Sequence, residues 1–313
     1  MAGIIHFGIS PCEVFIYCAP SYISSEVHPL VAGSQTHLLT RYCPRVSELK
    51  LERILRDHRG DGLPGLAMQT ITAPKRRVLI AIPAYNEEAT LGEVISRVRA
   101  ATPEFDLLII NDGSQDNSGQ ILKQLQVTTA THLCNLGYGR TIQTAVKYAL
   151  CCDYEALITL DADGQHQPEE IRGLFQEFVN GGWDVLIGSR HVNRQTYSGV
   201  PLGRQMGMRL FSILVKSTTG KRVYDTSSGL KVIGRNVFEP LTYWHFIDFH
   251  AEAIVYLLRL GYQVGEYPIS VATRTKGKSM YSALSHFKYP LKTLLMILLG
   301  IVQAGLTRRG NRQ

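Results

Sequence analysis

From about residue 76 onward, short apolar runs alternate with longer segments in which apolar residues recur at helical spacing. The predicted strands are residues 77–82, 106–110, 155–160 and 184–189, and the predicted helices lie near 87–100, 115–126, 138–150 and 168–180. Strands that alternate with helices in this way are typical of a mostly parallel sheet covered by helices. The pattern therefore predicts an α/β fold.

The two ends of the chain do not follow this pattern. Residues 1–75 contain scattered apolar runs and one segment, 46–58, with roughly helical spacing. We expect a poorly defined N-terminal extension there and assign no chemistry to it. The predicted division is this extension, one large domain over residues 76–285, and a basic and apolar helical tail over residues 286–313.

The net charge of +7 is unevenly distributed. The segment 271–313 has no acidic residue, and its basic residues are Arg274, Lys276, Lys278, Lys288, Lys292, Arg308, Arg309 and Arg312. A nucleic-acid-binding protein is expected to spread its basic residues more widely, so we predict no nucleic-acid partner. Basic residues interleaved with Leu, Ile, Tyr and Phe suit an anionic membrane surface or a phosphate. The alternative is a solvated helical tail.

Membrane-spanning and secreted classes are disfavoured. No segment reaches the ~20 apolar residues that a spanning helix requires. The nearest candidate, 294–306, contains Gln303 and could lie in the membrane interface, pack onto the domain or form an oligomer contact. The first ten residues do not resemble a signal peptide, and the six cysteines include no CxxC pair. The sequence favours a cytoplasmic protein, peripheral at the inner face of the membrane.

Polar motifs follow the predicted strands. They are PAYNEE at 83–88, NDGSQDNS at 111–118, DADGQHQP at 161–168 and SRH at 189–191. In open α/β sheets, ligands bind beyond the carboxyl ends of the strands. We therefore expect these motifs to form one binding site.

Asp161 and Asp163 are the first candidates for chemistry in this site. In an extended stretch, residues i and i+2 point to the same side, so both carboxylates could face one ligand. Two carboxylates with Gln165 nearby suit Mg²⁺ or Mn²⁺, which prefer hard oxygen ligands. His166 is also near enough to join, but taken alone it is more typical of a surface residue at a helix N-terminus than of a ligand. The alternative for the pair is an Asp turn that leads into a helix at Pro168.

Two further motifs are weaker when each is taken alone. Asp112 and Ser114 follow a buried strand, where short polar side chains can reach a base or a ribose, although a simple turn explains them equally well. The glycine-rich turn NLGYGRT at 135–141 feeds a helix, and such backbone approaches phosphates closely.

Taken together and in order, seven motifs resemble those of family 2 glycosyltransferases of the dolichyl-phosphate mannose synthase-like branch. They are PAYNEE, NDGSQDNS, NLGYGR, LDADGQHQP, GSR, DTSSGLK and RTKGKS, and they span about Arg76 to Lys288. The resemblance implies a glycosyltransferase-A fold, a Rossmann-like three-layer α/β/α sandwich. It also implies a nucleoside-diphosphate-sugar donor bound through a divalent metal, and inversion at the anomeric carbon.

The resemblance also implies roles for single residues. On the nucleoside side, Pro83, Tyr85 and Glu87 would line the pocket, and Asp112 would reach the base. On the metal side, Asp161 would approach the ribose or the metal, Asp163 would hold the metal, and Gln165 could complete its coordination shell. Arg274 would contact the donor pyrophosphate, and Arg190 and Arg204 would match arginines that bind an acceptor phosphate.

The acceptor decides whether a base is needed. A polyprenyl phosphate brings an anionic oxygen, whereas a sugar hydroxyl needs a carboxylate within hydrogen-bond reach. Asp248 and Glu252 could supply it, or they could be capping or structural residues. Met280 stands where relatives that use dolichyl phosphate often have Lys.

The leading prediction is transfer of a sugar to a polyprenyl phosphate, and the alternative is transfer to a glycan hydroxyl in surface-polysaccharide synthesis. A nucleotidyltransferase and an inactive nucleotide-sugar-binding module are the alternatives from other classes.

Overall fold

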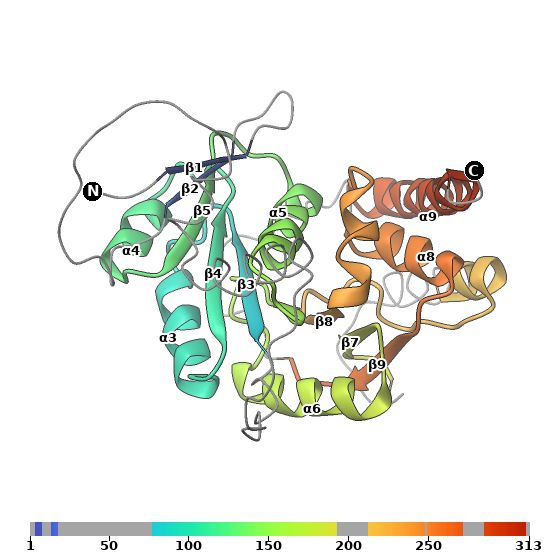
Figure 1. The fold of residues 1–313 in the computed structure, drawn as a ribbon, viewed down its shortest axis with the longest axis horizontal. Helices are drawn as coiled ribbons and strands as arrows, with labels where there is room; N and C mark the ends of the chain where they lie inside the picture. The colour runs from blue at the N-terminus through green and yellow to red at the C-terminus, as the bar shows by residue number, and fades with distance from the viewer. Residues whose placement is uncertain are drawn as a thin grey trace, which may run out of the picture.

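The computed structural model describes residues 4–7, 14–17, 77–192, 212–247, 249–271 and 285–310. Its described strands form one nine-stranded sheet in the order β1-β2-β5-β4-β3-β6-β8-β7-β9 (Figure 1). The strands are β1 (Ile4–Phe7), β2 (Val14–Tyr17), β3 (Val78–Ala84), β4 (Asp106–Asn111), β5 (Thr128–His132), β6 (Ala156–Thr159), β7 (Val185–Ser189), β8 (Lys231–Gly234) and β9 (Val264–Pro268). Neighbouring strands from β5 through β4 and β3 to β6 are parallel, as are β7 and β9. Strand β8 runs antiparallel to β6 and β7, so the seven strands from β5 to β9 form a mixed but mostly parallel sheet.

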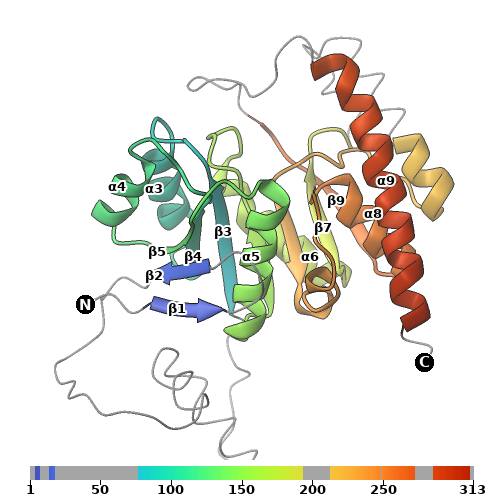
Figure 2. The ribbon, with the colours of Figure 1, turned by 90° about the horizontal axis from the view of Figure 1, so that it is seen from above.

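Helices cover both faces of the sheet (Figure 2). Helices α3 (Leu91–Ala101), α4 (Ser118–Gln124) and α6 (Ile171–Gly181) pack on one face, and α5 (Tyr138–Cys151), α8 (Ala251–Leu260) and α9 (Ser285–Gly310) contribute to the core on the other. Short 3₁₀ turns occur at Pro168–Glu170, Arg235–Val237 and Pro240–Thr242. This is the predicted three-layer α/β/α arrangement.

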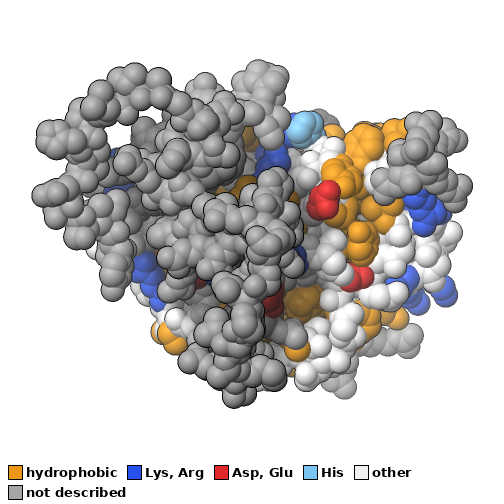
Figure 3. All heavy atoms as spheres, viewed as in Figure 1, with side chains coloured by type: hydrophobic (Ala, Val, Ile, Leu, Met, Phe, Trp, Pro, Cys, Tyr) orange, Lys and Arg blue, Asp and Glu red, His pale blue; other side chains and the backbone are white. Residues whose placement is uncertain are grey.

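Helix α9 lies beside α8 (Figures 1 and 2). It presents an apolar face to the surface. Its exposed apolar residues are Leu294, Leu295, Leu298, Val302 and Leu306. Figure 3 shows hydrophobic side chains gathered on the side of the molecule where Figure 1 places α8 and α9. Within the described ranges, no helix combines the length and the apolar character that crossing a bilayer would require.

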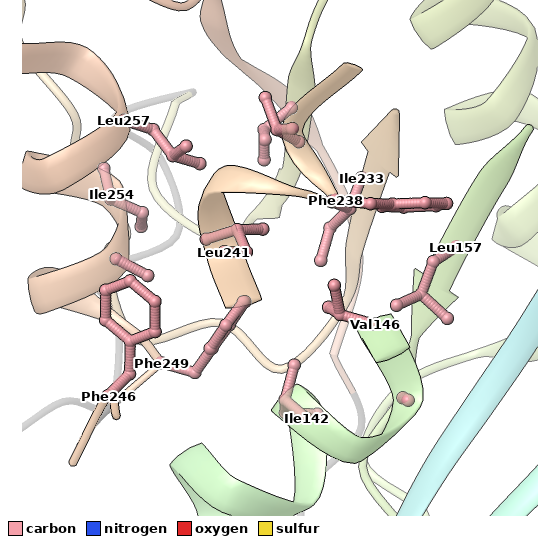
Figure 4. Packing of buried hydrophobic residues seen from close by; sticks show 14 of the residues in the cluster. Ile142, Val146, Leu157, Ile233, Phe238, Leu241, Phe246, Phe249, Ile254 and Leu257 are labelled. Atoms are coloured by element: carbon pink, nitrogen blue, oxygen red, sulfur yellow. The ribbon is translucent and has the colours of Figure 1, made fainter. Parts of the chain in front are cut away.

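The alternation of side chains along the strands divides the core into two clusters. Leu79 and Ala81 of β3 join the cluster under α5 and α8, whereas Ile80 and Ile82 join the cluster under α3, α4 and α6. Figure 4 shows the first cluster, in which α5, β6, β8, the turns after β8, and α8 contribute side chains. Burial on both faces explains why the strands are almost continuously apolar.

The four predicted strands and four predicted helices are present, with boundaries that shift by a few residues. The prediction missed β5, β8 and β9, because each is short and their sequences, TTATH, KVIG and VGEYP, lack a continuous apolar run. The tail is helical, as expected. The helix expected at 46–58 lies outside the described residues. Two strands of the extension are described: β1 pairs antiparallel with β2, and β2 pairs antiparallel with β5.

Candidate active site

The carboxyl ends of β3, β4 and β6 bring the first three polar motifs to one edge of the sheet. Ala84 of β3 pairs with Asn111 of β4, and Ala81 of β3 pairs with Thr159 of β6. The residues that follow these strands therefore lie side by side. This confirms the expectation that the motifs converge at the edge where α/β proteins bind ligands.

Hydrogen bonds from backbone to side chain join the first two motifs. The N–H of Asn86 donates to Oγ of Ser114 (3.1 Å), and the N–H of Gln115 donates back to Oδ1 of Asn86 (2.8 Å). The N–H of Glu88 donates to Oδ2 of Asp116 (3.0 Å). Asn86 adopts a left-handed backbone conformation (φ 55°), which asparagine tolerates better than most residues. The two loops thus form one braced unit.

The expected nucleoside-pocket residues flank this unit. Pro83 is partly exposed at the end of β3, and Tyr85, 36% exposed, follows it. The Glu87 carboxylate accepts a hydrogen bond from Oγ1 of Thr90 (3.3 Å), and the backbone N–H of Glu87 donates to Oγ of Ser118 (3.1 Å). Their contact with a nucleoside stays a prediction.

Asp112 is buried and bonded to the glycine-rich loop. Its Oδ1 lies 2.6 Å from Nδ1 of His132 and accepts from the N–H of Leu136 (2.9 Å), while Oδ2 accepts from the N–H of Gly137 (2.9 Å). Burial alone would raise the pKa of Asp112, but the bonds from His132 and the two amides outweigh it and lower that pKa. Asp112 therefore fixes the loop that precedes α5. Contact with a base stays a prediction, and His132 is a partner that the sequence pattern did not reveal.

The residues of DADGQH lie in a turn. Strand β6 ends at Thr159, the chain turns at Ala162 and Asp163, and Gly164 takes a φ of 74°. Oδ1 of Asp163 accepts from the N–H of Gln165 (3.0 Å), which is an Asx turn. The argument from strand alternation therefore does not apply to Asp161 and Asp163. Both side chains are nevertheless partly exposed at the carboxyl end of β6.

Gly229, in the motif DTSSGLK, has no side chain and so leaves space for the carboxylate of Asp161. A Cβ at Gly229 would lie 1.9 Å from Oδ2 of Asp161, so no other residue fits without moving the carboxylate. Oγ1 of Thr159 donates to the carbonyl oxygen of Gly229 (2.7 Å) and holds the two segments together. The sequence pattern placed this glycine in a motif but indicated no role for it.

His166 is a buried residue, only 7% exposed, and the expectation of a surface position is wrong. Its Nε2 lies 3.9 Å from Oδ2 of Asp161, and its buried Nδ1 has no hydrogen-bond partner among the described residues. Burial, with Arg190 and Lys231 nearby, lowers the pKa of His166 to about 4. The ring is therefore neutral near pH 7. A β-bridge between His166 and Val271 brings the chain that leads to RTKGKS beside the carboxylates.

The donor set suits a hard divalent cation. Asp161, Asp163 and Gln165 offer two carboxylates and an amide oxygen, which are ligands that Mg²⁺ and Mn²⁺ accept. No cluster of three or more His, Cys, Asp or Glu side chains that could hold a metal occurs in the described part of the chain. Two carboxylates without a third leave coordination positions for substrate phosphates.

Arg190 is held by a buried carboxylate. Its Nε and Nη2 donate to the two oxygens of Asp225 (2.8 and 2.9 Å), and Nη2 also donates to Oγ of Ser227 (2.9 Å). The Asp225 side chain has no exposed surface, and the Arg190 side chain is 22% exposed. Binding of an acceptor phosphate by Arg190 stays a prediction. Arg204, Arg274 and Asp248 lie outside the described residues.

Glu252, one of the two candidate bases, has no exposed surface. Its Oε2 accepts from the N–H of Ile247 (3.0 Å), and its Oε1 accepts from Nε2 of Gln303 on α9 (2.8 Å). A general base must reach the proton that it accepts. The geometry therefore favours the structural role for Glu252 that the sequence left open.

Lys231 and His250 link β8 to the starts of α5 and α8. Nζ of Lys231 contacts the carbonyl oxygen of Ser228 and lies 3.2 Å from Nδ1 of His250. The His250 ring stacks on Tyr138, the first residue of α5, with centroids 4.6 Å apart. Lys231 belongs to the motif DTSSGLK, but the sequence did not indicate its contact with His250, because only tertiary packing joins the two residues.

The chain is similar in sequence to several known proteins. A polyprenol monophosphomannose synthase from Mycolicibacterium smegmatis is 30% identical over 223 residues, which are 67% of this chain and 82% of that protein. A UDP-N-acetylglucosamine–dolichyl-phosphate N-acetylglucosaminyltransferase from Methanococcus voltae is 27% identical over 61% of this chain and 84% of its own length. An uncharacterized protein from Methanocaldococcus jannaschii is 30% identical over 50% of this chain, and the chain spans only 64% of that relative.

The fold also matches solved structures. Glucosyl-3-phosphoglycerate synthase from Mycobacterium tuberculosis, in complex with Mn²⁺, UDP-glucose and phosphoglyceric acid, superposes with a TM-score of 0.52 at 15% identity. The match covers 74% of this chain and 80% of that one, which establishes a glycosyltransferase-A type of fold. Residues 79–242 match the family described as glycosyl transferase family 2. The chain thus belongs to glycosyl transferase family 2, in line with the dolichyl-phosphate mannose synthase-like branch, and is a glycosyltransferase.

Proposed function

We propose that this glycosyltransferase moves a sugar, with inversion, from a nucleoside-diphosphate sugar to a polyprenyl phosphate at the cytoplasmic face of the membrane. The observation that carries the proposal is the braced edge at β3, β4 and β6, which presents Asp161 and Asp163 in a chain whose named relatives act on polyprenyl phosphates. Family membership sets the nucleotidyltransferase alternative aside.

Asp161, Asp163 and Gln165 would hold Mg²⁺ or Mn²⁺ together with the donor diphosphate. The bound ion would neutralise the charge that develops on the leaving nucleoside diphosphate. Gly229 leaves space for the Asp161 carboxylate, and the Asx turn at Asp163 directs the chain toward Gln165. Asp112 fixes the loop before α5, so that side of the site is formed before the donor arrives.

The proposed acceptor is a lipid phosphate. A phosphate oxygen of the lipid attacks the anomeric carbon as the bond to the diphosphate breaks, and the nucleoside diphosphate leaves with the electron pair. The attacking oxygen is already anionic, so no protein base is required. The burial of Glu252 is consistent with that requirement. Arg190, Arg204 and Arg274 remain proposed phosphate contacts, with Arg274 on the donor and the others on the acceptor.

Helix α9 supports a peripheral membrane location. Its exposed face carries Leu294, Leu295, Leu298, Val302 and Leu306, and Arg308 is exposed near its end. An apolar face with basic residues beside it suits the interface of an anionic bilayer. A lipid acceptor would then reach the site from the surface to which the enzyme is bound.

The decisive test is a thermal-shift panel of GDP-mannose, UDP-glucose and UDP-N-acetylglucosamine, with and without Mn²⁺ or Mg²⁺. We expect one nucleotide sugar to stabilise the wild type only with metal, and Asp163→Asn to abolish that shift. Asp153→Asn is the matched control, because Asp153 lies before the other end of β6 and pairs with Arg235.

Transfer is then measured with the donor so identified and undecaprenyl phosphate in detergent. Transfer that requires metal and Asp163 supports the proposal. Donor binding without transfer to the lipid, but with transfer to a glycan hydroxyl that Asp248→Asn abolishes, would establish the alternative acceptor. Binding without any product would establish an inactive binding module.

A further inference from the structure

The segment that precedes α8 lies between the candidate active site and helix α9. We call its described residues, 244–247, 249 and 250, the pre-α8 segment. On the site side, a Cβ on Gly139 of α5 would lie 2.2 Å from the carbonyl oxygen of Phe246, so the two backbones are in close contact. His250 stacks on Tyr138, which directly follows the loop held by Asp112. Any shift of the pre-α8 segment therefore moves groups at the edge of the site.

On the other side, two polar contacts connect this segment to α9. Nε1 of Trp244 donates to Oγ1 of Thr307 (2.8 Å). The N–H of Ile247 donates to Glu252, which in turn accepts from Gln303 (2.8 Å). Both Gln303 and Thr307 belong to α9, one helical turn apart. The position of α9 is thus linked to the segment at both of these points.

The Glu252–Gln303 contact is costly to bury. Glu252 has no exposed surface, Gln303 is 8% exposed, and Oε1 of Gln303 has no partner among the described residues. A buried acceptor without a donor and a buried carboxylate each reduce stability. An apolar pair would fill the same space at lower cost, which indicates a role other than stability.

We propose that Glu252 and Gln303 are positioning residues. They couple the packing of α9 against α8 to the position of the pre-α8 segment, and so set the rate of sugar transfer. The inference rests on the proposed function in one respect, since transfer is its readout. It assigns the residue expected as a possible base to a different task. It also makes α9 part of the catalytic apparatus in addition to a membrane contact.

Two glycines of α9 give a matched test. A Cβ on Gly300 would lie 2.6 Å from the carbonyl oxygen of Glu252, whereas a Cβ on Gly305 meets nothing within 4 Å. We expect Gly300→Ala to displace α9 from its packing position against α8. It should lower kcat by about tenfold to a hundredfold, because small misplacements of reacting groups reduce the rate by such factors. The KM for the nucleotide sugar should not change. Gly305→Ala, the same chemical change on the same helix, should match the wild type in both.

Glu252 itself separates positioning from base catalysis. In Glu252→Gln the side-chain oxygen still accepts from Ile247, and the new amide donates to Oε1 of Gln303 once the Gln303 amide rotates. Glu252→Ala loses both contacts. A positioning role predicts that Glu252→Gln restores most of the kcat that Glu252→Ala loses, whereas a catalytic base predicts that both variants are equally inactive.

Hydrogen exchange at the Ile247 amide provides a readout that does not require turnover. We expect faster exchange in Gly300→Ala and Glu252→Ala than in the wild type, Gly305→Ala and Glu252→Gln. The inference is overturned if Gly300→Ala equals Gly305→Ala in both kcat and exchange, or if Glu252→Gln is as inactive as Glu252→Ala. Absence of transfer in the wild type would refute the proposed function, and exchange would then decide the coupling alone.

Discussion

Among single residues, Asp225 is a buried carboxyl whose ionisation is controlled by one partner, Arg190. Burial alone would raise its pKa, but the Arg190 guanidinium outweighs burial and holds the pKa of Asp225 well below its usual range. The charged form of Asp225 is therefore the stable one in the folded protein. The pair fixes Arg190, which follows β7, against the segment before β8.

We predict that Asp225→Asn lowers the free energy of unfolding at pH 7 by about 3 kcal/mol, because it leaves the Arg190 charge without its buried partner. A carboxyl with a lowered folded pKa stabilises above its unfolded pKa, near 3.8, and that contribution is lost as pH falls below this value. As the pH is lowered below about 4, urea unfolding should therefore show that the variant loses less of its free energy of unfolding than the wild type does.

The control is Asp153→Asn, which breaks an exposed bridge to Arg235. Exposed bridges contribute little, so we expect a change of at most about 0.5–1 kcal/mol. Equal losses in the two variants would mean that the Asp225 pair is no more important to stability than a surface bridge.

At the scale of elements, the contact between β6 and β8 determines where the candidate metal ligands lie. The backbone of Gly229, just before β8, passes directly beside the Asp161 carboxylate that follows β6. An antiparallel neighbour on one side of β6 therefore shapes a site that the parallel strands on its other side only partly define.

Gly229→Ala should displace the Asp161 carboxylate and abolish the metal-dependent thermal shift by nucleotide sugar. Calorimetric titration of the donor with and without Mn²⁺ would measure the loss. Gly92→Ala is the control, since its Cβ would make only an ordinary contact, 3.8 Å from Cγ2 of Ile121 on α4. Metal-dependent binding that survives in Gly229→Ala would show that Asp161 is not needed for the metal.

At the scale of the whole molecule, α9 combines an exposed apolar face with a chain segment rich in basic residues. The exposed leucines lie on the helix face turned away from the buried residues Met296, Ile297, Gly300, Gln303 and Ala304. The segment 271–313 carries basic residues and no acidic residue, so two such segments would repel one another, whereas an anionic bilayer would attract each of them.

We therefore expect the protein to sediment with vesicles that contain phosphatidylglycerol and to be released as NaCl rises, because salt screens headgroup attraction. Leu298→Glu should abolish binding, and Arg308→Gln should weaken it about fivefold, since one basic residue near the surface contributes about 1 kcal/mol. Leu133→Glu, at an exposed leucine outside α9, is the control. Binding that ignores salt and both α9 substitutions would refute the membrane role of this face.

The sequence by itself determined the strands β3, β4, β6 and β7, the helices between them, and the edge at which the motifs meet. Both follow from local patterns: apolar periodicity reports which faces are buried, and parallel strands place their carboxyl ends together. The motifs likewise sufficed to indicate the family. Short strands such as β5 were not predicted from the sequence, because a strand that its neighbours in the sheet bury needs no apolar run of its own.

Only the tertiary structure decided what the individual side chains do. Asp112 meets His132, Arg190 meets Asp225, and Glu252 meets Gln303 across separations that no local pattern encodes. DADGQH has the composition of a metal site, but its turn and its glycine support come from packing against β8. The roles of these residues depend on burial and on partners far along the chain, and both exist only after the chain has folded.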